Sequence, residues 1–168
     1  MVTEEQILEK TGLFYVSDYH LEMILLPYIK EKIDKNKIII YTEKNLEESI
    51  NVLLNKVNLS GIDKEKIRNL NWKNTDDIEI ERLNEFLNNA EISLLKRGII
   101  DTNIENEEKN IIVIVNGSFN YIKNIKSKIN RDIKKNIKLV ECFHVGDSDV
   151  DISELSQKYE NILNTKKI

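Results

Sequence analysis

The chain has 168 residues, of which 40% are hydrophobic and 32% are charged, the composition of one globular domain with a core of its own. Its 25 basic and 29 acidic residues give a net charge of -4, which excludes the overall positive field of a general nucleic-acid-binding protein. The single cysteine, Cys142, excludes an internal disulfide framework and a cysteine-rich zinc site.

No apolar run approaches the roughly 20 residues needed to cross a bilayer, and the acidic, amphipathic segment 1–12 is unlike a secretory leader. We therefore expect a cytoplasmic protein without membrane contact. No internal repeat or Pro/Ser-rich linker divides the sequence, so residues 1–168 are predicted to form a single domain.

The first predicted strand, residues 13–16 (LFYV), runs directly into a helix whose apolar face extends from residue 21 to residue 33. Pro27 lies inside this helix and predicts a bend, because proline lacks an amide donor and crowds the preceding turn. The second strand, residues 37–42 (KIIIYT), is a nearly continuous apolar run, which indicates burial on both faces of a sheet.

A second amphipathic helix follows over residues 46–57, with Asn45 as its predicted N-cap and Glu48 as the acid of a capping box. The polar stretch 59–77 is predicted to be an irregular excursion from the sheet. Its one tryptophan, Trp72, is expected to pack in the core, the commoner role of a lone Trp, with a ligand pocket as the alternative.

Further along the chain, residues 80–94 predict a third helix and residues 101–109 an acidic loop. The third strand, 110–116 (NIIVIVN), precedes a fourth helix over 122–133, and the fourth strand is 137–144 (IKLVECFH). A fifth helix is expected over residues 152–162, opened by a capping box of Asp151 and Glu154. This alternation predicts an α/β three-layer sandwich around a mostly parallel sheet of about four strands, of the RecA or Rossmann type.

Polar side chains follow every predicted strand, and in a parallel sheet the carboxyl ends of the strands form the ligand-binding edge. We therefore predict a site for a small ligand or a protein partner at that edge. Its candidate residues are Ser17, Asp18, His20, Glu43, Asn116, Ser118, His144 and Asp147.

Two kinds of chemistry are open to this set. His20 has the residue type of a general base or phosphoryl acceptor, with Asp18 as the group that orients it; the alternative is a histidine that only bonds nearby backbone. His20 and His144 with Asp18, Asp147 or Asp149 offer metal ligands, but no HxH or HExxH spacing supports a metal site. We predict neither a metal nor a cofactor.

Nucleotide and nucleic-acid binding are not favoured. The chain lacks both the GxGxxG and the GxxxxGK[ST] patterns, and Asp18 would repel a phosphate at the first strand–helix junction. The basic residues of the fourth helix, from Lys123 to Lys135, are not interleaved with aromatic side chains, so a solvated outer face explains them.

Residues 13–42 resemble the start of MEDS domains, a family of DcmR-type sensory domains. Tyr15 matches the tyrosine of the family's first strand, and Pro27 with Tyr28 matches its Pro-aromatic pair. Thr11 and Lys32 stand where the family often has His and Gly. The family is similar to KaiC- and RecA-like ATPases that have lost the Walker A loop.

The resemblance implies that residues 17–20 occupy the place of the missing phosphate loop and that Asn116 stands where an ATPase has an acidic magnesium ligand. It implies a non-catalytic sensory or regulatory module. The alternatives are a small-molecule or phosphoryl-transfer enzyme using His20 and Asp18, and a scaffolding homodimer. The strand order also stays open: a RecA-like sheet places the fourth strand beside the first, whereas a flavodoxin-like sheet places the first between the second and third.

Overall fold

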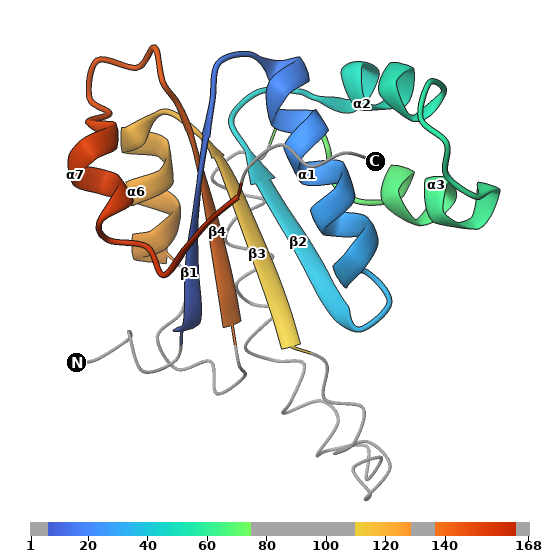
Figure 1. Cartoon of the computed structure of the whole chain (residues 1–168), viewed down its shortest axis with the longest axis horizontal. Helices are drawn as coiled ribbons and strands as arrows, with labels where there is room; N and C mark the ends of the chain where they lie inside the picture. The colour runs from blue at the N-terminus through green and yellow to red at the C-terminus, as the bar shows by residue number, and fades with distance from the viewer. Residues whose placement is uncertain (1–6, 75–109, 129–136, 164–168) are drawn as a thin grey trace, which may run out of the picture.

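The computed structural model describes residues 7–74, 110–128 and 137–163. Within these ranges five parallel strands form one sheet with helices on both faces, which confirms the predicted α/β three-layer class (Figure 1). The strands are β1 (Ile7–Tyr15), β2 (Asn36–Thr42), β3 (Asn110–Gly117), β4 (Ile137–His144) and β5 (Asn161–Leu163). The helices are α1 (Asp18–Lys32), α2 (Glu47–Leu54), α3 (Gly61–Arg68), α6 (Phe119–Lys128) and α7 (Ile152–Ser156). The helix expected at 80–94 and the acidic loop at 101–109 lie outside the described residues.

The strand order across the sheet is β2-β3-β4-β1-β5. β4 lies beside β1, with Tyr15 paired to His144, and β3 lies beside β2, with Asn116 paired to Thr42. Of the two predicted orders, this is the one with the fourth predicted strand beside the first, and the order with the first strand between the second and third is excluded. Because every strand runs parallel to its neighbours, all the polar junction residues lie at one edge of the sheet.

The sheet buries two apolar cores, one on each face, because successive side chains of a strand point to opposite faces. On the face covered by α1, α2 and α3, Leu13 of β1 belongs to the same buried cluster as Leu25 of α1. On the other face, Val113 of β3 lies in a cluster with Ile125 of α6 and Leu155 of α7. The sheet therefore separates α1, α2 and α3 from α6 and α7, as Figure 1 shows.

The strand count and the fifth helix differ from the sequence prediction. β1 begins at Ile7 instead of residue 13, and α7 ends at Ser156 instead of continuing to residue 162. Ile162 lies in a fifth strand, β5, which pairs with the outer edge of β1. The amide of Glu160 also donates to the carbonyl of Lys10 at 3.3 Å. Hydrogen bonding to the open edge of β1 outweighs the helical spacing of the apolar residues.

Two helix starts were also mispredicted. The N-cap position of α2 is Leu46, one residue later than expected, and Asn45 accepts a hydrogen bond from the amide of Glu47 at 3.0 Å. Helix α3 lies inside the stretch predicted to be irregular. The Ser60 hydroxyl caps α3 by accepting a hydrogen bond from the amide of Asp63 at 3.1 Å. The helix was not predicted because only one of its residues, Ile67, is buried.

Three local predictions can be compared directly with the structure. Trp72 packs in the core, 2% exposed, and its indole nitrogen donates to the carbonyl of Ile67 at 2.8 Å. The carboxylate of Asp151 caps α7 by accepting from the amide of Glu154 at 3.2 Å. Helix α1 continues through Pro27 as one helix. None of the helices in the described ranges has the length and apolar character needed to cross a membrane.

Candidate functional site

The eight predicted site residues lie at the carboxyl edge of the sheet, and the chain itself supplies hydrogen-bond or ion-pair partners for each of them. At the centre of the edge the hydroxyl of Tyr15 donates to Oδ1 of Asn116 at 2.6 Å. The amide nitrogen of Asn116 in turn donates to Oγ1 of Thr42 at 3.3 Å. All three side chains are buried, so this network joins β1, β3 and β2 instead of facing an open pocket.

The N-terminus of α6 is covered by two carboxylates of the chain. Oε1 of Glu43 accepts from the backbone amide of Ser118 at 2.8 Å, and Oδ2 of Asp147 accepts from the amide of Phe119 at 3.0 Å. The Ser118 hydroxyl accepts from the amide of Tyr121 at 3.1 Å. Free amides at a helix N-terminus are the usual anion site of such folds. Here these three amides already have internal acceptors.

The pKa of Asp147 reports this arrangement. Hydrogen bonds from the backbone amides of Asp149 and Phe119 lower the pKa of Asp147 below its ordinary value, and nearby His144 adds to the effect. A carboxylate that accepts amide hydrogen bonds is favoured in its charged form. Asp147 is therefore a negative charge fixed at the helix terminus, in the position that a bound anion would need.

The junction between β1 and α1 is closed in a similar way. The hydroxyl of Ser17 accepts from the backbone amide of His20 at 3.1 Å, as an N-cap does. The ring nitrogen Nδ1 of His20 accepts from the amide of Val16 at 3.0 Å. Asp18 lies 3.9 Å from the ammonium of Lys44, both being partly exposed. Of the two predicted roles for His20, these contacts fit the structural one, in which the histidine bonds nearby backbone.

His144 also serves the backbone. Its Nδ1 accepts from the amide of Gly146 at 2.9 Å, and its Nε2 lies 3.1 Å from the carbonyl oxygen of Val16, which it can reach as a donor. Its ring meets that of Tyr15 edge-on, with centroids 5.3 Å apart. The rings of His20 and His144 thus both contact the backbone of Val16, which places the two histidines close together at the carboxyl edge.

Neither predicted chemistry has a complete set of groups at this edge. In the described ranges no group of three or more His, Cys, Asp or Glu side chains could hold a metal ion. Asp18 pairs with Lys44. Among the described residues, no hydrogen bond joins the side chain of Asp18 to that of His20. The edge therefore holds the two loops in place and offers no aligned acid–base pair.

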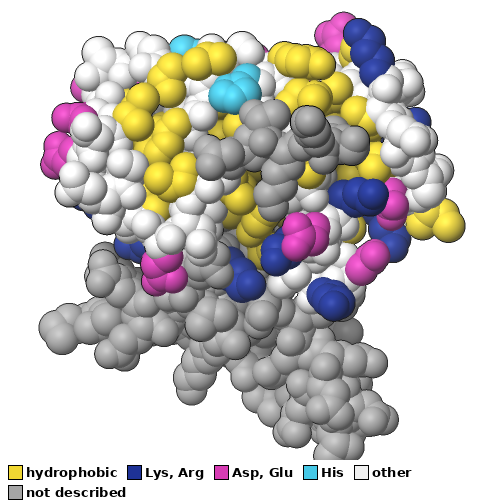
Figure 2. Space-filling model, viewed as in Figure 1, with side chains coloured by type: hydrophobic (Ala, Val, Ile, Leu, Met, Phe, Trp, Pro, Cys, Tyr) yellow, Lys and Arg dark blue, Asp and Glu magenta, His cyan; other side chains and the backbone are white. Residues whose placement is uncertain are grey.

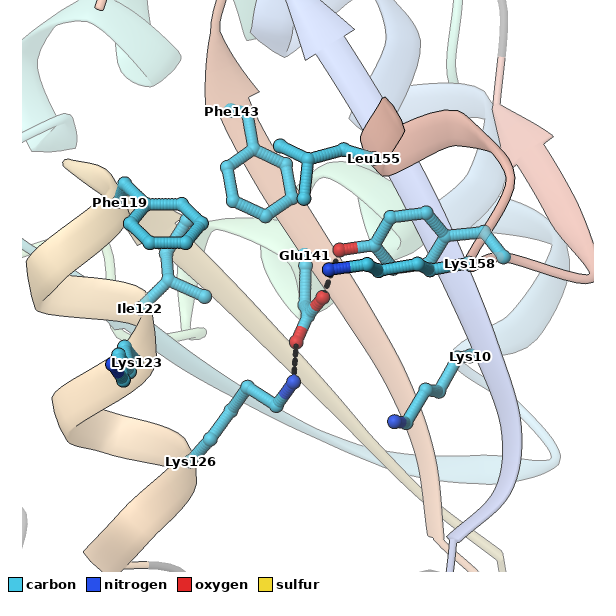
Figure 3. A pocket seen from close by; sticks show the side chains of 10 residues that line it. Lys10, Phe119, Ile122, Lys123, Lys126, Glu141, Phe143, Leu155 and Lys158 are labelled. Carbon is cyan, nitrogen blue, oxygen red and sulfur yellow. Dashed lines mark hydrogen bonds and ion pairs between the residues drawn. The ribbon is translucent and has the colours of Figure 1, made fainter. Parts of the chain in front are cut away.

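A different site, which the sequence analysis missed, lies on the α6 and α7 face of the sheet. It is a cavity of about 350 Å³ between α6, β4 and the segment that follows α7 (Figure 3). The walls contain an apolar group and a lysine group. The apolar group is Phe119, Ile122, Phe143, Leu155 and Tyr159. The lysines are Lys10, Lys123, Lys126 and Lys158.

The cavity is built around one buried carboxylate. Glu141 of β4 is 2% exposed, and its Oε1 lies 2.8 Å from the ammonium of Lys126. Its Oε2 accepts a hydrogen bond from the hydroxyl of Tyr159. Burial, together with the negative charge of Glu141, raises the pKa of Tyr159, so Tyr159 keeps its proton as a donor at neutral pH.

A second cavity, of about 400 Å³, lies between α1 and α2. Both carboxylate oxygens of Glu22 lie 2.6 Å from the hydroxyl of Ser49 there, and burial raises the pKa of Glu22. Glu48 adds a second acid to the lining, and Lys56 is its one base. This cavity lacks the lysine surplus of the first one, and Tyr19 is the aromatic residue named in its lining.

One signal in the sequence pointed to the first cavity. Glu141 interrupts the apolar strand 137–144, and a charge inside a strand covered on both faces needs a partner. The partner lysines and the tyrosine lie on other elements, so the topology was needed to find them. Comparison with protein-family models, with curated proteins and with solved structures gives no match.

Proposed function

We propose that this chain is a non-catalytic sensory or regulatory module of degenerate RecA-like type, which binds a ligand or a partner protein and hydrolyses no nucleotide. The observation that carries the proposal is the covered N-terminus of α6, where Glu43 and Asp147 accept hydrogen bonds from the amides of Ser118 and Phe119. A phosphate group at that helix terminus would have to displace two carboxylates of the chain. A phosphate at residues 17–20, the place that the resemblance gives to the missing phosphate loop, would meet the carboxylate of Asp18.

The hydrogen bonds of Asn116 support the same proposal. Tyr15 at the end of β1 bonds Asn116 at the end of β3, with β4 between the two strands. In the resemblance to RecA-like ATPases, Asn116 stands where an acidic magnesium ligand is expected. A neutral amide that is buried and already bonded to Tyr15 and Thr42 is a poor ligand for Mg²⁺, which prefers charged oxygens and its own waters.

A partner protein at this edge would meet exposed apolar side chains. Val16 and Tyr19 are each 61% exposed beside the β1–α1 junction. Figure 2 shows hydrophobic side chains on either side of a histidine at the end of the molecule where the strands of Figure 1 terminate. Such side chains favour contact with another protein over contact with a phosphate group.

The test is a thermal-shift series with Mg·ATP, Mg·ADP and inorganic phosphate, run beside a phosphate-release assay. We expect no shift in melting temperature and no phosphate release above the buffer control. A ligand at a hundred times its dissociation constant adds about 2.7 kcal/mol to the stability of the folded state, which a melt detects easily. Phosphate release from Mg·ATP above the buffer control would overturn the proposal. A shift with Mg·ATP that exceeds the shift with phosphate alone would show that the nucleotide site is not degenerate.

The predicted enzyme alternative is tested with the same protein. His20→Ala removes the proposed base, and Asp18→Asn removes its orienting acid. If the chain releases phosphate and both variants abolish the release while still melting cooperatively, then the chain is an enzyme. If His20→Ala lowers only the melting temperature, His20 acts through its bond to the Val16 amide.

A further inference from the structure

The cavity between α6, β4 and α7 has an apolar end and a basic end. In Figure 3 the side chains of Phe119, Phe143 and Leu155 lie at one end, and those of Lys10 and Lys126 lie at the other. Its volume of about 350 Å³ falls in the range of small-molecule sites, which are mostly apolar with a few placed polar groups.

The apolar end is an aromatic cluster. The ring of Phe143 lies 6.2 Å from the ring of Phe119 and 6.2 Å from the ring of Tyr159, both tilted, and its stack with Phe14 is at 5.7 Å. Ring pairs at these distances attract one another in offset or tilted geometries. A planar aromatic group entering the cavity would add to this set of contacts.

The charge of the lining favours an anion. Four lysines and one glutamate line the cavity, although the whole chain carries a net charge of -4. Glu141 offsets one of the four lysines through its ion pair with Lys126, so the lining keeps a surplus of three positive charges. Lys123 on α6 and Lys158 after α7 line the cavity and are exposed to solvent, and we call them the rim lysines.

We infer that this cavity binds a small amphipathic organic anion, with an aromatic body against Phe119 and Phe143 and a carboxylate, sulfonate or phosphate group between Lys123 and Lys158. This inference rests on the proposed function, since it names the ligand class of the sensory module. Glu141 and Tyr159 form the floor of the site. Their hydrogen bond ties the segment after α7 to β4, and the ion pair of Glu141 with Lys126 holds the Lys126 ammonium in the cavity.

The probe for the test is 8-anilinonaphthalene-1-sulfonate, whose fluorescence rises in an apolar site, and its uncharged counterpart is N-phenyl-1-naphthylamine. Binding is measured with the full chain and with two double variants. Lys123→Gln with Lys158→Gln removes the rim charges. Lys30→Gln with Lys35→Gln is the matched control, because it removes two exposed charges far from this cavity and gives the same net charge.

We expect one saturable site for the sulfonate, with the same Kd in the wild type and in the control variant. The rim variant should raise that Kd by about three- to tenfold, as expected for two partly exposed ion pairs. Added salt should weaken binding to the wild type more than binding to the rim variant. The uncharged probe should bind all three proteins equally and more weakly than the sulfonate binds the wild type.

An equal Kd for the sulfonate in all three folded proteins would overturn the inference, and so would tighter binding of the uncharged probe. The result is independent of the nucleotide test. Absence of saturable sulfonate binding, together with no response to Mg·ATP, would remove this site and leave the non-catalytic function standing. Phosphate release from Mg·ATP that survives in the rim variant would remove the proposed function, whereas the sulfonate result alone decides this site.

Discussion

Tyr15 of β1 and Tyr41 of β2 are both buried, but their hydroxyl groups differ in their partners. The Tyr15 hydroxyl donates to Asn116 at 2.6 Å, whereas the Tyr41 hydroxyl is buried with no hydrogen-bond partner in the described part of the chain. Burial raises the pKa of both, that of Tyr41 to about 12, so both are neutral donors at physiological pH. They form a natural matched pair for measuring what the edge network contributes.

We expect Tyr15→Phe to lower the free energy of unfolding by about 1–3 kcal/mol, because it leaves the buried Oδ1 of Asn116 without its donor. Tyr41→Phe should change it by less than about 0.5 kcal/mol or raise it, since the substitution removes a buried polar atom that has nothing to bond. Urea unfolding of both variants beside the wild type gives the comparison. Equal losses in the two variants would contradict this account of the carboxyl edge.

At the scale of elements, α6 depends on a carboxylate from another part of the chain. The lowered pKa of Asp147 means that its charged form stabilises the folded state. This contribution is present above the pKa of an unfolded Asp, about 3.9, and is lost as the pH falls through the lower pKa of the folded state. Asp147→Asn should therefore lower the melting temperature by about 1–3 °C at pH 7, the size of a helix-terminus charge effect.

The difference between Asp147→Asn and the wild type should shrink as the pH is lowered from about 5 to 2, because the wild-type carboxylate is protonated in that window. Asp149→Asn, two residues further along at an exposed position, is the control and should melt like the wild type throughout. The measurement is a set of melts by circular dichroism at several pH values. A gap between Asp147→Asn and the wild type that is the same at pH 7 and pH 2 would show that the charge has no role.

The elements that could be predicted from the sequence are those with a strong local signal. β2, β3 and β4 were found within one residue at each end, because strands covered on both faces are continuous apolar runs. β5 could not be found, since three residues at the outer edge of β1 are defined by their partner strand and not by their own pattern. α3 was missed because its one buried residue, Ile67, leaves almost no apolar periodicity.

The candidate sites, too, were predictable only where the signal is local in the sequence. The edge residues were predicted together because parallel strands end on one side, and the structure confirms that placement. Their internal hydrogen bonds could not be predicted, because Glu43 and Ser118 meet only once β2 lies beside β3. Glu141 was visible as a charge inside an apolar strand, but its partners Lys126 and Tyr159 come from two other elements.

At the scale of the whole molecule, one sheet supports two cores, and none of the described helices contributes to both. Leu25 of α1 and Trp72 lie in the core on one face, and Ile125 of α6 lies in the core on the other. The strands β1 to β4 contribute alternate side chains to both cores, so losing the packing on one face removes support from strands that the other face needs. The prediction of a single domain becomes a prediction of one cooperative unfolding transition.

The sole tryptophan makes this measurable, because Trp72 reports only on the α1 face. We expect Ile125→Ala to lower the free energy of unfolding by about 2–5 kcal/mol, the usual cost of truncating a fully buried Ile. Its urea transition should have the same midpoint by Trp72 fluorescence as by far-ultraviolet circular dichroism, although the substitution lies on the opposite face. Leu25→Ala, on the side of Trp72, is the matched variant and should behave alike. In the opposite case, Ile125→Ala lowers the midpoint measured by circular dichroism but keeps the wild-type midpoint measured by fluorescence. The two faces then unfold separately, and the single-domain prediction is wrong.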